Sequence, residues 1–436
     1  MNLMNDINKS DPEIAAAIKD ELKREEKRVE LIPSENNVSK AVLQAMGSVF
    51  TNKYSEGYPH KRYYGGQKFV DVMEDIAVER AKKLFGAEHV NVQPYSGSPA
   101  NLAVYFALLD IGDKFMGFDL SCGGHLTHGS PVSFSGAWYK VQPYTVDKKT
   151  ELLDFDAIKK QAREFKPKMM ISGFSAYPRE FDFKAFQEVC DEVESYHFSD
   201  IAHIAGLVAG GAHQSPVPVA DVVTTTTHKT LRGPRGAIIM SKIEDRYKEK
   251  YHPNWKKNLA QMIDFRVFPG LQGGPHDHVN AAKAVAFKEA LQPDFKEYAA
   301  QIVKNAKAMA AELMASGMKL VTDGTDNHLV LIDLRPSGFE GKGKEVQNAL
   351  DEAAITVNKN SIPFDTASPF NPSGIRLGTP AITTRGMKES ESKAIGKSIA
   401  NIINHKLDKA LIEKEKQNIM ELTEQFPLYP DLDILG

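Results

Sequence analysis

The chain has 436 residues, enough for two or three domains of roughly 100–200 residues each with a substantial buried core. Its 54 lysine and arginine residues nearly balance 57 aspartate and glutamate residues, so the net charge of -3 gives no reason to expect nucleic acid or an anionic membrane as a partner. Two cysteines exclude a disulfide framework, no apolar run reaches the ~18 residues of a membrane helix, and the polar start MNLMNDINKS is unlike a secretory signal, so we expect a soluble, cytoplasmic protein.

Residues 1–55 are expected to form an N-terminal arm that begins with a helix. Ser10-Asp11-Pro12-Glu13 is typical of a capping box, and Ile14, Ile18 and Leu22 follow at helical spacing. The arm then continues into the polar segment ELIPSENNVS.

Residues 56–290 are expected to form a large α/β domain, because strand-like apolar runs alternate there with helical patterns. The expected strands include KFMGFDL, KMMISGF, YHFSD and DVVTTTT, and the expected helices include ANLAVYFALL and FKAFQEVCDEVES. Strands separated by helices of this length form right-handed crossovers and a mainly parallel sheet covered on both faces. Ligands of such sheets bind at the carboxyl ends of the strands.

Residues 291–436 are expected to form a smaller α+β domain, since the predicted units become shorter. A helix over residues 295–316 is followed by the strand HLVLIDL, the helix GKEVQNALDEA and the strand ITVNKN. A last helix is predicted from Lys388 to about Lys406.

Lys229 follows the β-branched run VVTTTT and therefore stands at the carboxyl end of a predicted strand. A lysine there either extends its charged end into solvent or has its amine held in a pocket. An ordinary lysine has a pKa near ~10.4 and becomes a good nucleophile only when burial or a cationic neighbour lowers that value. Because His228, Arg232 and Arg235 are close in sequence, an amine able to form a Schiff base is one interpretation.

Asp200 ends the preceding predicted strand, and one helical connection separates it from the strand before Lys229. An aspartate after a strand is by itself more often a turn or cap residue than a catalytic one. Beside Lys229 it fits pyridoxal phosphate chemistry, in which a carboxylate keeps the pyridine nitrogen protonated.

The stretch QPYSGSPANLAVYFALL predicts an anion site at the start of a helix. Ser98 suits the N-cap and Pro99 the first helical position, so Ser96, Gly97 and Ser98 would place hydroxyls and amides where a phosphate is favoured. A plain capped helix explains these residues equally well. The conjunction of an anion site, a carboxylate and an amine on one sheet edge is a much stronger indication than any one of them.

With these features the sequence resembles the serine hydroxymethyltransferase family along nearly its whole length. The matching blocks follow the family order and are ELIPSENNVS, NKYSEGYPHKRYYGG, NVQPYSGSPAN, GGHLTHGSPV, GFSAYPR, SDIAHIAGLVA, VVTTTTHKTLRGPRG, FPGLQGGPHDH, TDNHLVLIDLR, ITVNKNSIPFD and SGIRLGTPAITTRG. The resemblance implies the aspartate-aminotransferase-like fold type I of pyridoxal phosphate enzymes, with a seven-stranded, mainly parallel sheet in the large domain.

The resemblance also implies an activity. The enzyme would transfer the hydroxymethyl carbon of serine to tetrahydrofolate, its co-substrate, and would yield glycine and 5,10-methylenetetrahydrofolate reversibly. Folate-independent retro-aldol cleavage of β-hydroxy amino acids would be a side activity. The family forms homodimers with shared active sites and implies no metal.

Carried over by position, the resemblance implies a cofactor site around Lys229, which would hold pyridoxal phosphate as an internal aldimine. Asp200 would pair with the pyridinium nitrogen, and His125 would stack on the ring. The other implied cofactor residues are His203, Ser175, Arg235, the phosphate-binding Ser96, Gly97 and Ser98, and Gly273 from the neighbouring subunit.

For the amino-acid substrate, the resemblance implies that Arg376 clamps the carboxylate with Ser34 and His203 beside it, because a guanidinium binds a carboxylate through two hydrogen bonds. Thr226 and His228 would tune the choice of reaction.

The resemblance further implies a loop contributed across the dimer interface. Its Glu56 would act as acid or base near the substrate hydroxyl, with Tyr54 and Tyr64 close by. The implied folate-site residues are Tyr63, Leu120, Gly124, His125, Leu126, Asn358, Ser368, Pro369 and Phe370. Ordinary interface packing is a second explanation for the tyrosines.

Several positions depart from the usual family pattern. Pro33 and Asn37 flank Ser34 in place of a common alanine and a frequent aromatic residue, and Tyr95 and Pro99 replace a histidine and a glutamine beside the phosphate loop. The proline removes one backbone N–H there. The segment Ser241–Val267 is longer than in typical bacterial members, and either alters subunit contacts or forms a surface loop.

Two rival functions remain at the level of sequence. A threonine-aldolase-like or glycine-acyltransferase enzyme of the same fold type would share the lysine, the aspartate and the phosphate loop, but has no required place for YSEGYPHKRYYGG. A non-catalytic regulator that keeps the fold and binds pyridoxal phosphate or RNA would show decay at Lys229, Asp200 or Arg376, and all three are present.

Overall fold

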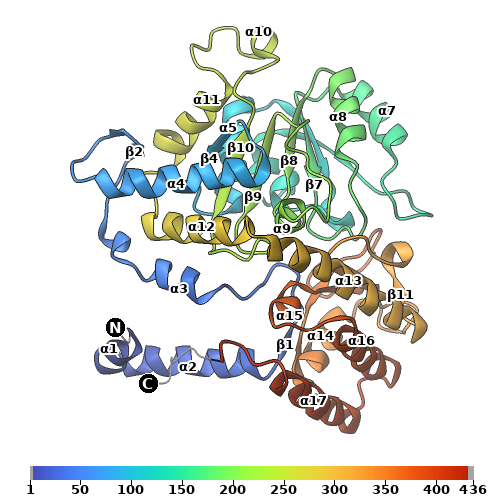
Figure 1. The fold of residues 1–436 in the computed structure, drawn as a ribbon. Coiled ribbons are helices and arrows are strands. Elements are labelled where there is room, and N and C mark those ends of the chain that lie inside the picture. The colour runs from blue at the N-terminus through green and yellow to red at the C-terminus, as the bar shows by residue number, and fades with distance from the viewer. Residues whose placement is uncertain (1–2, 431–436) are drawn as a thin grey trace.

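The computed structural model describes residues 3–430, in which helices surround two main sheets (Figure 1). The larger sheet has seven strands in the order β4-β10-β9-β8-β7-β5-β6. Its strands are β4 (His89–Asn91), β5 (Lys114–Phe118), β6 (Lys140–Tyr144), β7 (Met169–Gly173), β8 (Tyr196–Asp200), β9 (Val222–Thr226) and β10 (Ala237–Ser241).

The strand directions confirm the predicted fold class. Strands β5, β6, β7, β8 and β9 pair in parallel, whereas β10 runs antiparallel to both β4 and β9. The parallel register sets Phe198 opposite Val222 and Asp200 opposite Thr224, so the carboxyl ends of β8 and β9 lie side by side. Lys229 follows β9 by three residues, which brings it to the same edge as Asp200.

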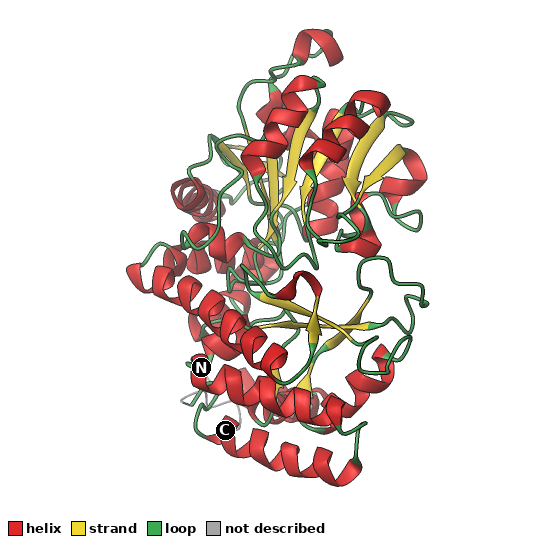
Figure 2. Cartoon of the chain, turned by 90° about the vertical axis from the view of Figure 1, so that its right-hand side faces the viewer, coloured by secondary structure: helices red, strands yellow, loops and turns green. Residues whose placement is uncertain are grey.

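The strands in the middle of this sheet are buried on both faces, since every residue of β7, β8, β9 and β10 is buried, including the polar residues that end β8 and β9. Along β10, Ile238 and Met240 belong to one core and Ala237 and Ile239 to the other, as the two-residue period of a strand requires. Figure 2 shows helices on both sides of these strands. The helices of this part are α4 (Lys68–Phe85), α5 (Gly97–Leu108), α6 (Phe134–Trp138), α7 (Phe155–Phe165), α8 (Phe183–Glu192), α9 (Ala205–Ala209), α10 (Lys248–Tyr251), α11 (Leu259–Phe265) and α12 (Asp277–Ala290).

The second main sheet is antiparallel and has the strand order β11-β12-β15-β14. Its strands are β11 (Lys319–Leu320), β12 (Leu329–Asp333), β14 (Asn358–Asn360) and β15 (Gly374–Gly378), and the accompanying helices are α13 (Pro293–Ala315), α14 (Gly343–Glu352), α15 (Pro380–Thr384), α16 (Glu389–Asn404) and α17 (Lys409–Glu424). Helix α13 joins the two parts, since Phe295 and Ile302 lie in a core of the larger sheet and Met309 and Leu313 in the core of the smaller one.

The N-terminal arm contacts both parts of the chain: its β1 (Val29–Glu30) region packs on the core of the smaller sheet, whereas Val42 of its helix α3 (Lys40–Met46) packs against Ala282 and Ala286 of α12. It also contains α1 (Leu3–Ser10) and α2 (Pro12–Glu26), and its hairpin β2 (Gly57–Tyr58) with β3 (Lys61–Arg62) follows. Strand β1 pairs in parallel with β13 (Ile355–Thr356), and Val29 and Leu31 are fully buried.

Three local predictions are wrong. The cap of α2 is Asp11, whose side chain accepts from Ile14 N, rather than Ser10, because Pro12 occupies the first helical position. Helix α5 begins at Gly97 with Ser96 as its N-cap, so Ser98 is not the cap. Helix α16 is not the last helix: Lys406 and Leu407 adopt left-handed conformations that end the turn after it, and α17 follows with Ile412 and Ile419 buried.

Two further observations bear on the class of protein. No helix within residues 3–430 is long and apolar enough to cross a membrane. Cys122 and Cys190 are free and buried, which matches the expectation that they form no disulfide.

Removing the Phe198 ring should destabilise the fold strongly. Phe198 is fully buried in the middle of β8, so Phe198→Ala should lower the free energy of unfolding by about 3–5 kcal/mol, measured by urea denaturation. Phe69→Ala, at a phenylalanine that is 70% exposed, is the control and should change it by less than about 0.5 kcal/mol. Similar losses in both variants would contradict the assigned core.

Candidate active site

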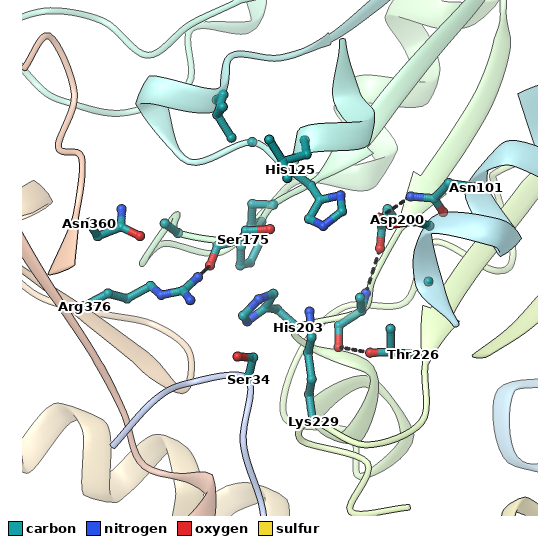
Figure 3. A pocket seen from close by; sticks show the side chains of 18 of the residues that line it. Ser34, Asn101, His125, Ser175, Asp200, His203, Thr226, Lys229, Asn360 and Arg376 are labelled. Carbon is teal, nitrogen blue, oxygen red and sulfur yellow. Dashed lines mark hydrogen bonds between the residues drawn. The ribbon is translucent and has the colours of Figure 1, made fainter. Parts of the chain in front are cut away.

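A cavity of about 540 Å³ lies at the carboxyl ends of β7, β8 and β9, and strands β14 and β15 of the smaller sheet supply residues to its wall (Figure 3). The lining residues are Ser34, Ser96, Gly97, Ser98, Asn101, Leu120, Gly124, His125, Leu126, Phe174, Ser175, Ala176, Asp200, Ala202, His203, Thr226, His228, Lys229, Arg235, Lys359, Asn360, Ser361, Pro369 and Arg376. The predicted amine, carboxylate and phosphate loop are therefore brought together.

Lys229 supplies the amine. Burial lowers its pKa to about 8, and the charges of Arg376 and Arg235 act in the same direction while Asp200 opposes them. Its Nζ makes no hydrogen bond or ion pair with any residue in the described range 3–430, although the side chain lines the cavity. Such an amine is available as a nucleophile.

Lys283 on α12 shows why burial alone does not identify that amine. Burial lowers the pKa of Lys283 to about 7, further than that of Lys229. However, Lys283 Nζ donates to three oxygens and lies outside the cavity lining. Of the two buried lysines in the described chain, Lys229 is the one with a free amine facing a cavity.

Asp200 is a buried carboxylate whose charged form is well supported. Asn101 Nδ2 and His128 Nε2 donate to its Oδ2 at 2.8 and 3.2 Å, and the backbone N–H of Ala202 donates to its Oδ1 at 3.0 Å. Burial would raise its pKa, but the hydrogen bonds from His128 and Asn101 hold the pKa below the usual range. The carboxylate therefore stays ionised and can accept one more proton donor from the cavity.

The N-terminus of α5 is the candidate anion site. Its N-cap Ser96 has an extended backbone and makes no side-chain capping bond within the helix, which leaves the amides of the first turn to a ligand. Glycine is required at position 97 for steric reasons, because a Cβ there would lie 2.9 Å from Thr226 Cγ2. Pro99 occupies the third helical position, where its missing N–H has no partner within the helix.

Two histidines project into the cavity in Figure 3. His125 is held by Thr127 Oγ1 at 2.8 Å, and burial lowers its pKa to about 4, so its ring is neutral and can stack on a flat ligand. Burial and the charges of Lys229 and Arg376 hold the pKa of His203 well below its usual range.

The proton of His203 can be placed from its neighbour His328. His203 Nδ1 lies 3.2 Å from His328 Nε2, and His328 Nδ1 is buried without a hydrogen-bond partner among the described residues. A buried orphan N–H is rarer than an under-satisfied acceptor, so we assign the His328 proton to Nε2, from which it donates to His203. His203 then presents an Nε2–H donor.

His228 and Thr226 flank the lysine. Burial, with the charges of Lys229 and Arg235, lowers the pKa of His228 to about 3, and its buried Nδ1 has no hydrogen-bond partner among the described residues. The hydroxyl of Thr226 donates to the carbonyl of Ala202 at 3.3 Å, which ties β9 to the turn after Asp200.

Arg376 is a candidate carboxylate receptor on the wall opposite Asp200. Its Nε donates to Asn358 Oδ1 at 3.1 Å and its Nη1 to the carbonyl of Ser175 at 2.6 Å. It forms no salt bridge with an acidic residue of the described chain, and burial lowers its pKa to about 10, so it remains charged at neutral pH. Ser34 lines the same cavity.

Five predicted residues lie elsewhere, and we call them the arm cluster: Tyr54, Glu56, Tyr63, Tyr64 and Gly273. None of them lines the described cavity. Tyr54 Oη donates to Glu56 Oε1 at 3.2 Å, its ring meets Tyr64 edge to face, and a Cβ on Gly273 would lie 3.2 Å from that same Glu56 oxygen. All three tyrosine rings are more than half exposed.

The predicted folate residues divide in the same way. Leu120, Gly124, Leu126 and Pro369 line the cavity. Asn358 is held behind Arg376, and Ser368 and the exposed Phe370 do not line the cavity.

Several lining or supporting residues are missed by sequence reasoning. Asn101 has a visible signal, since it lies one helical turn after Gly97 on α5 and so shares its face. His128 has a weaker one as the second histidine of GGHLTHG. The contributions of Lys359, Asn360 and Ser361 depend on how the smaller sheet docks and have no local signal.

The departures from the family pattern have identifiable contacts. Tyr95 stacks on His276 at 4.2 Å between ring centroids and donates to the carbonyl of Gly274. Pro33 packs against Gly378, where a Cβ would lie 2.5 Å from the Cα of Pro33. The interpretation of Ser241–Val267 as a plain surface loop is wrong, because it contains α10 and α11 and buries apolar side chains such as Ile263 in a core of the large sheet.

His125, His128 and Asp200 also have donor atoms within 4.8 Å of one another, as a metal site would require. His128 Nδ1 accepts from His125 N and its Nε2 donates to Asp200, so both nitrogens are already committed. We assign no metal here.

The residues present fit pyridoxal phosphate. A free buried amine suits its aldehyde, the ionised Asp200 suits its ring nitrogen, the uncapped end of α5 suits its phosphate, and the neutral ring of His125 suits its flat face.

Comparison with known proteins gives a consistent family. The family model that matches is described as serine hydroxymethyltransferase and covers residues 7–399. The serine hydroxymethyltransferase of Afipia carboxidovorans (strain ATCC 49405 / DSM 1227 / KCTC 32145 / OM5) is 56% identical over 426 residues, which cover 96% of this chain and 95% of the relative. That of Koribacter versatilis (strain Ellin345) is 54% identical over 425 residues, covering 98% of this chain and 96% of the relative.

Burying Lys229 should cost stability when no cofactor is bound. Its pKa is about 8 in the fold against 10.5 ordinarily, so the unfolded chain binds the extra proton between these values and wild-type stability rises with pH across this window. Cofactor-free Lys229→Met should therefore be more stable than wild type at pH 7, by up to about 3 kcal/mol, with the difference shrinking from pH 8 to 10. Denaturant titrations at several pH values measure this, and a pH-independent difference would contradict the assigned burial.

Proposed function

The chain belongs to the serine hydroxymethyltransferase family, and we propose that the cavity at the ends of β7, β8 and β9 is where its own residues carry out the family reaction. It is a pyridoxal-phosphate-dependent transferase of one-carbon groups that interconverts serine and glycine with tetrahydrofolate as co-substrate. The observation that carries the residue assignment is the unpartnered amine of Lys229 beside the ionised Asp200, in one cavity with Arg376.

Holding the cofactor falls to residues of the large sheet. Lys229 provides the amine for covalent attachment, Asp200 binds the ring nitrogen, and His125 lies against the ring. The hydroxyls and amides of Ser96, Gly97 and Ser98 hold the phosphate, with Arg235, Ser175 and His203 around the rest. When bound, pyridoxal phosphate supplies an electron sink for the bond that breaks at the amino acid's α-carbon.

Holding the amino acid falls to the opposite wall. Arg376 still has guanidinium N–H groups that are not engaged by Asn358 or Ser175, and these can donate to a carboxylate. Ser34 adds a hydroxyl, and His203 adds the N–H donor argued above. Thr226 and His228 set the surroundings of Lys229 and are our candidates for steering the reaction.

A second copy of the chain completes the site in this proposal. Glu56 is the proposed acid or base, and in its own chain it does not line the cavity. Its position is nevertheless fixed, because Ser55 Oγ donates to Asp277 and Arg62 Nη1 donates to the carbonyls of both Ser55 and Gly57. An anchored carboxyl that does not line the cavity of its own chain suits a group that serves the partner's cavity, together with Tyr54, Tyr64 and Gly273.

The folate side of the cavity is assigned to Leu120, Gly124, His125, Leu126 and Pro369, which line it. Tyr63 of the partner, Asn358, Ser368 and Phe370 would lie at its margin. We further propose that residues 1–55 form an arm, 56–290 the large domain and 291–436 the small domain, and that the enzyme works in the cytoplasm, which is supported by its two free, buried cysteines.

Folate should control the breakdown of serine. Protein carrying pyridoxal phosphate should form glycine from serine at least about tenfold faster with tetrahydrofolate than without it, as measured by chromatography of the amino acids. Slower folate-independent cleavage of other β-hydroxy amino acids is expected as a side activity. Glycine formation that ignored tetrahydrofolate while those amino acids were split readily would favour an aldolase instead.

Mixing two inactive variants should restore activity if the sites are shared. Lys229→Ala and Glu56→Gln each disable a different contribution, so a hybrid dimer has one doubly altered site and one intact site. Random reassortment makes half of the dimers hybrids, and the mixture should reach about a quarter of wild-type activity. Either variant mixed with itself is the control, and a mixture no more active than these controls would refute sharing.

A further inference from the structure

Lys283 on α12 is a buried charged side chain that the proposed mechanism does not use. It is 1% exposed and is among the largest fully buried side chains of the described chain. Its Nζ donates to the carbonyl of Val92 at 2.5 Å, to the carbonyl of Pro94 at 3.2 Å and to Asn280 Oδ1 at 3.0 Å. Three oxygen acceptors match the three N–H bonds of an ammonium, whereas a neutral amine would leave one of them facing a lone pair, so these hydrogen bonds favour the charged form against the burial that lowers the pKa of Lys283.

The two carbonyls belong to the segment that leads from β4 to the N-cap of α5. This segment, residues 92–95, ends directly before Ser96. The side chain of Gln272 grips the same segment from another side, since it donates to the carbonyl of Gln93 and accepts from the N–H of Tyr95. The N–H of Ala237 donates to the carbonyl of Pro94.

The chain makes room for this lysine. A Cβ on Gly236 would lie 2.5 Å from Lys283 Cε, so the lysine stem passes over the bare face of that glycine. Gly236 closes the sequence RGPRG just before β10, which explains a glycine at this position by close approach rather than by an unusual backbone angle.

We propose that Lys283 is a positioning residue for the phosphate group of the cofactor: its ammonium fixes the carbonyls of Val92 and Pro94 and thereby the direction of the amides and hydroxyls of Ser96, Gly97 and Ser98. The inference rests on the proposed function, because it assumes that this loop holds a phosphate. An anion at a helix N-terminus depends on where a few N–H bonds point, and the loop before the helix sets that direction.

Loss of Lys283 should weaken the binding of the phosphate and leave the binding of the rest of the cofactor unchanged, so a comparison of pyridoxal phosphate with pyridoxal tests its role. Pyridoxal lacks the phosphate but keeps the aldehyde and the ring. In cofactor-free Lys283→Met, whose side chain keeps nearly the same length without hydrogen-bond donors, pyridoxal phosphate should bind at least about tenfold more weakly than in wild type, whereas pyridoxal binding should change by less than about twofold. Both dissociation constants are measured by fluorescence titration, together with the melting temperature.

Two companion variants keep this test decisive. Gly236→Ala pushes the lysine stem without removing its charge and should give the same selective loss, even if Lys283→Met does not fold. Phe295→Leu lies on α13 in a core of the same sheet and controls for general destabilisation. It should leave the ratio of the two dissociation constants at the wild-type value.

The outcomes are distinguishable. A selective loss of pyridoxal phosphate binding in the Lys283 or Gly236 variant supports the proposal. Equal weakening of both ligands, or an unchanged ratio in a folded Lys283→Met, would overturn it and leave Lys283 as a part of the core only. If wild type itself bound pyridoxal phosphate no better than pyridoxal, the phosphate-site assignment on which the inference rests would be wrong instead.

Discussion

The site depends on holding an amine and a carboxylate at adjoining strand ends without letting them pair. Asp200 and Lys229 sit at the carboxyl ends of β8 and β9, and no salt bridge joins them. The carboxylate takes its hydrogen bonds from Asn101, His128 and Ala202 instead. A direct pair would favour the charged amine and raise its pKa, whereas the observed arrangement leaves burial to lower that pKa to about 8. The residues behind Asp200 are therefore what keeps Lys229 reactive.

This separation needs close backbone packing at several points. Gly206 at the start of α9 lies against the turn after Lys229, where a Cβ would collide with the carbonyl of Thr230, and the hydroxyl of Thr230 bonds back to the N–H of Gly206 and the carbonyl of His203. A side chain at Gly206 would push apart the two loops that carry His203 and Lys229. Gly206 in SDIAHIAG and Gly97 in SGS thus allow segments at the wall of the cavity to pack closely, where a larger side chain would force them apart.

The sequence alone predicts the site residues that directly follow strands. It predicts less well those whose position depends on how distant segments pack together. Parallel strands separated by helices bring their carboxyl ends to one edge, so the pattern of strands and helices alone places Asp200, Lys229 and the loop at Ser96 together. The predicted cap is misplaced because Ser96 and Ser98 are chemically equivalent choices and only the backbone angles decide between them. His128 and Asp200 are 72 residues apart, and their hydrogen bond follows from the path of the loop after β5, which no local pattern encodes. Helix α17 is missed because most of its residues are charged or polar and only a few apolar ones are buried. The role of the arm cluster is not visible within one chain either, because its tyrosines are exposed there.

The cavity carries an excess of positive charge, which suits anionic ligands. Within the described chain it is lined by four cationic side chains, Lys229, Arg235, Lys359 and Arg376, and by one carboxylate, Asp200. This excess opposes protonation of the histidines, and the charges of Lys229 and Arg376 add to burial in lowering the pKa of His203. A phosphate brings a charge of roughly -2 and an amino-acid carboxylate another -1, which together would offset the excess of positive charge. Binding of either ligand would relieve part of a repulsion that the fold alone must tolerate, but because both ligands are anionic, the field of the cavity alone would make each weaken the binding of the other.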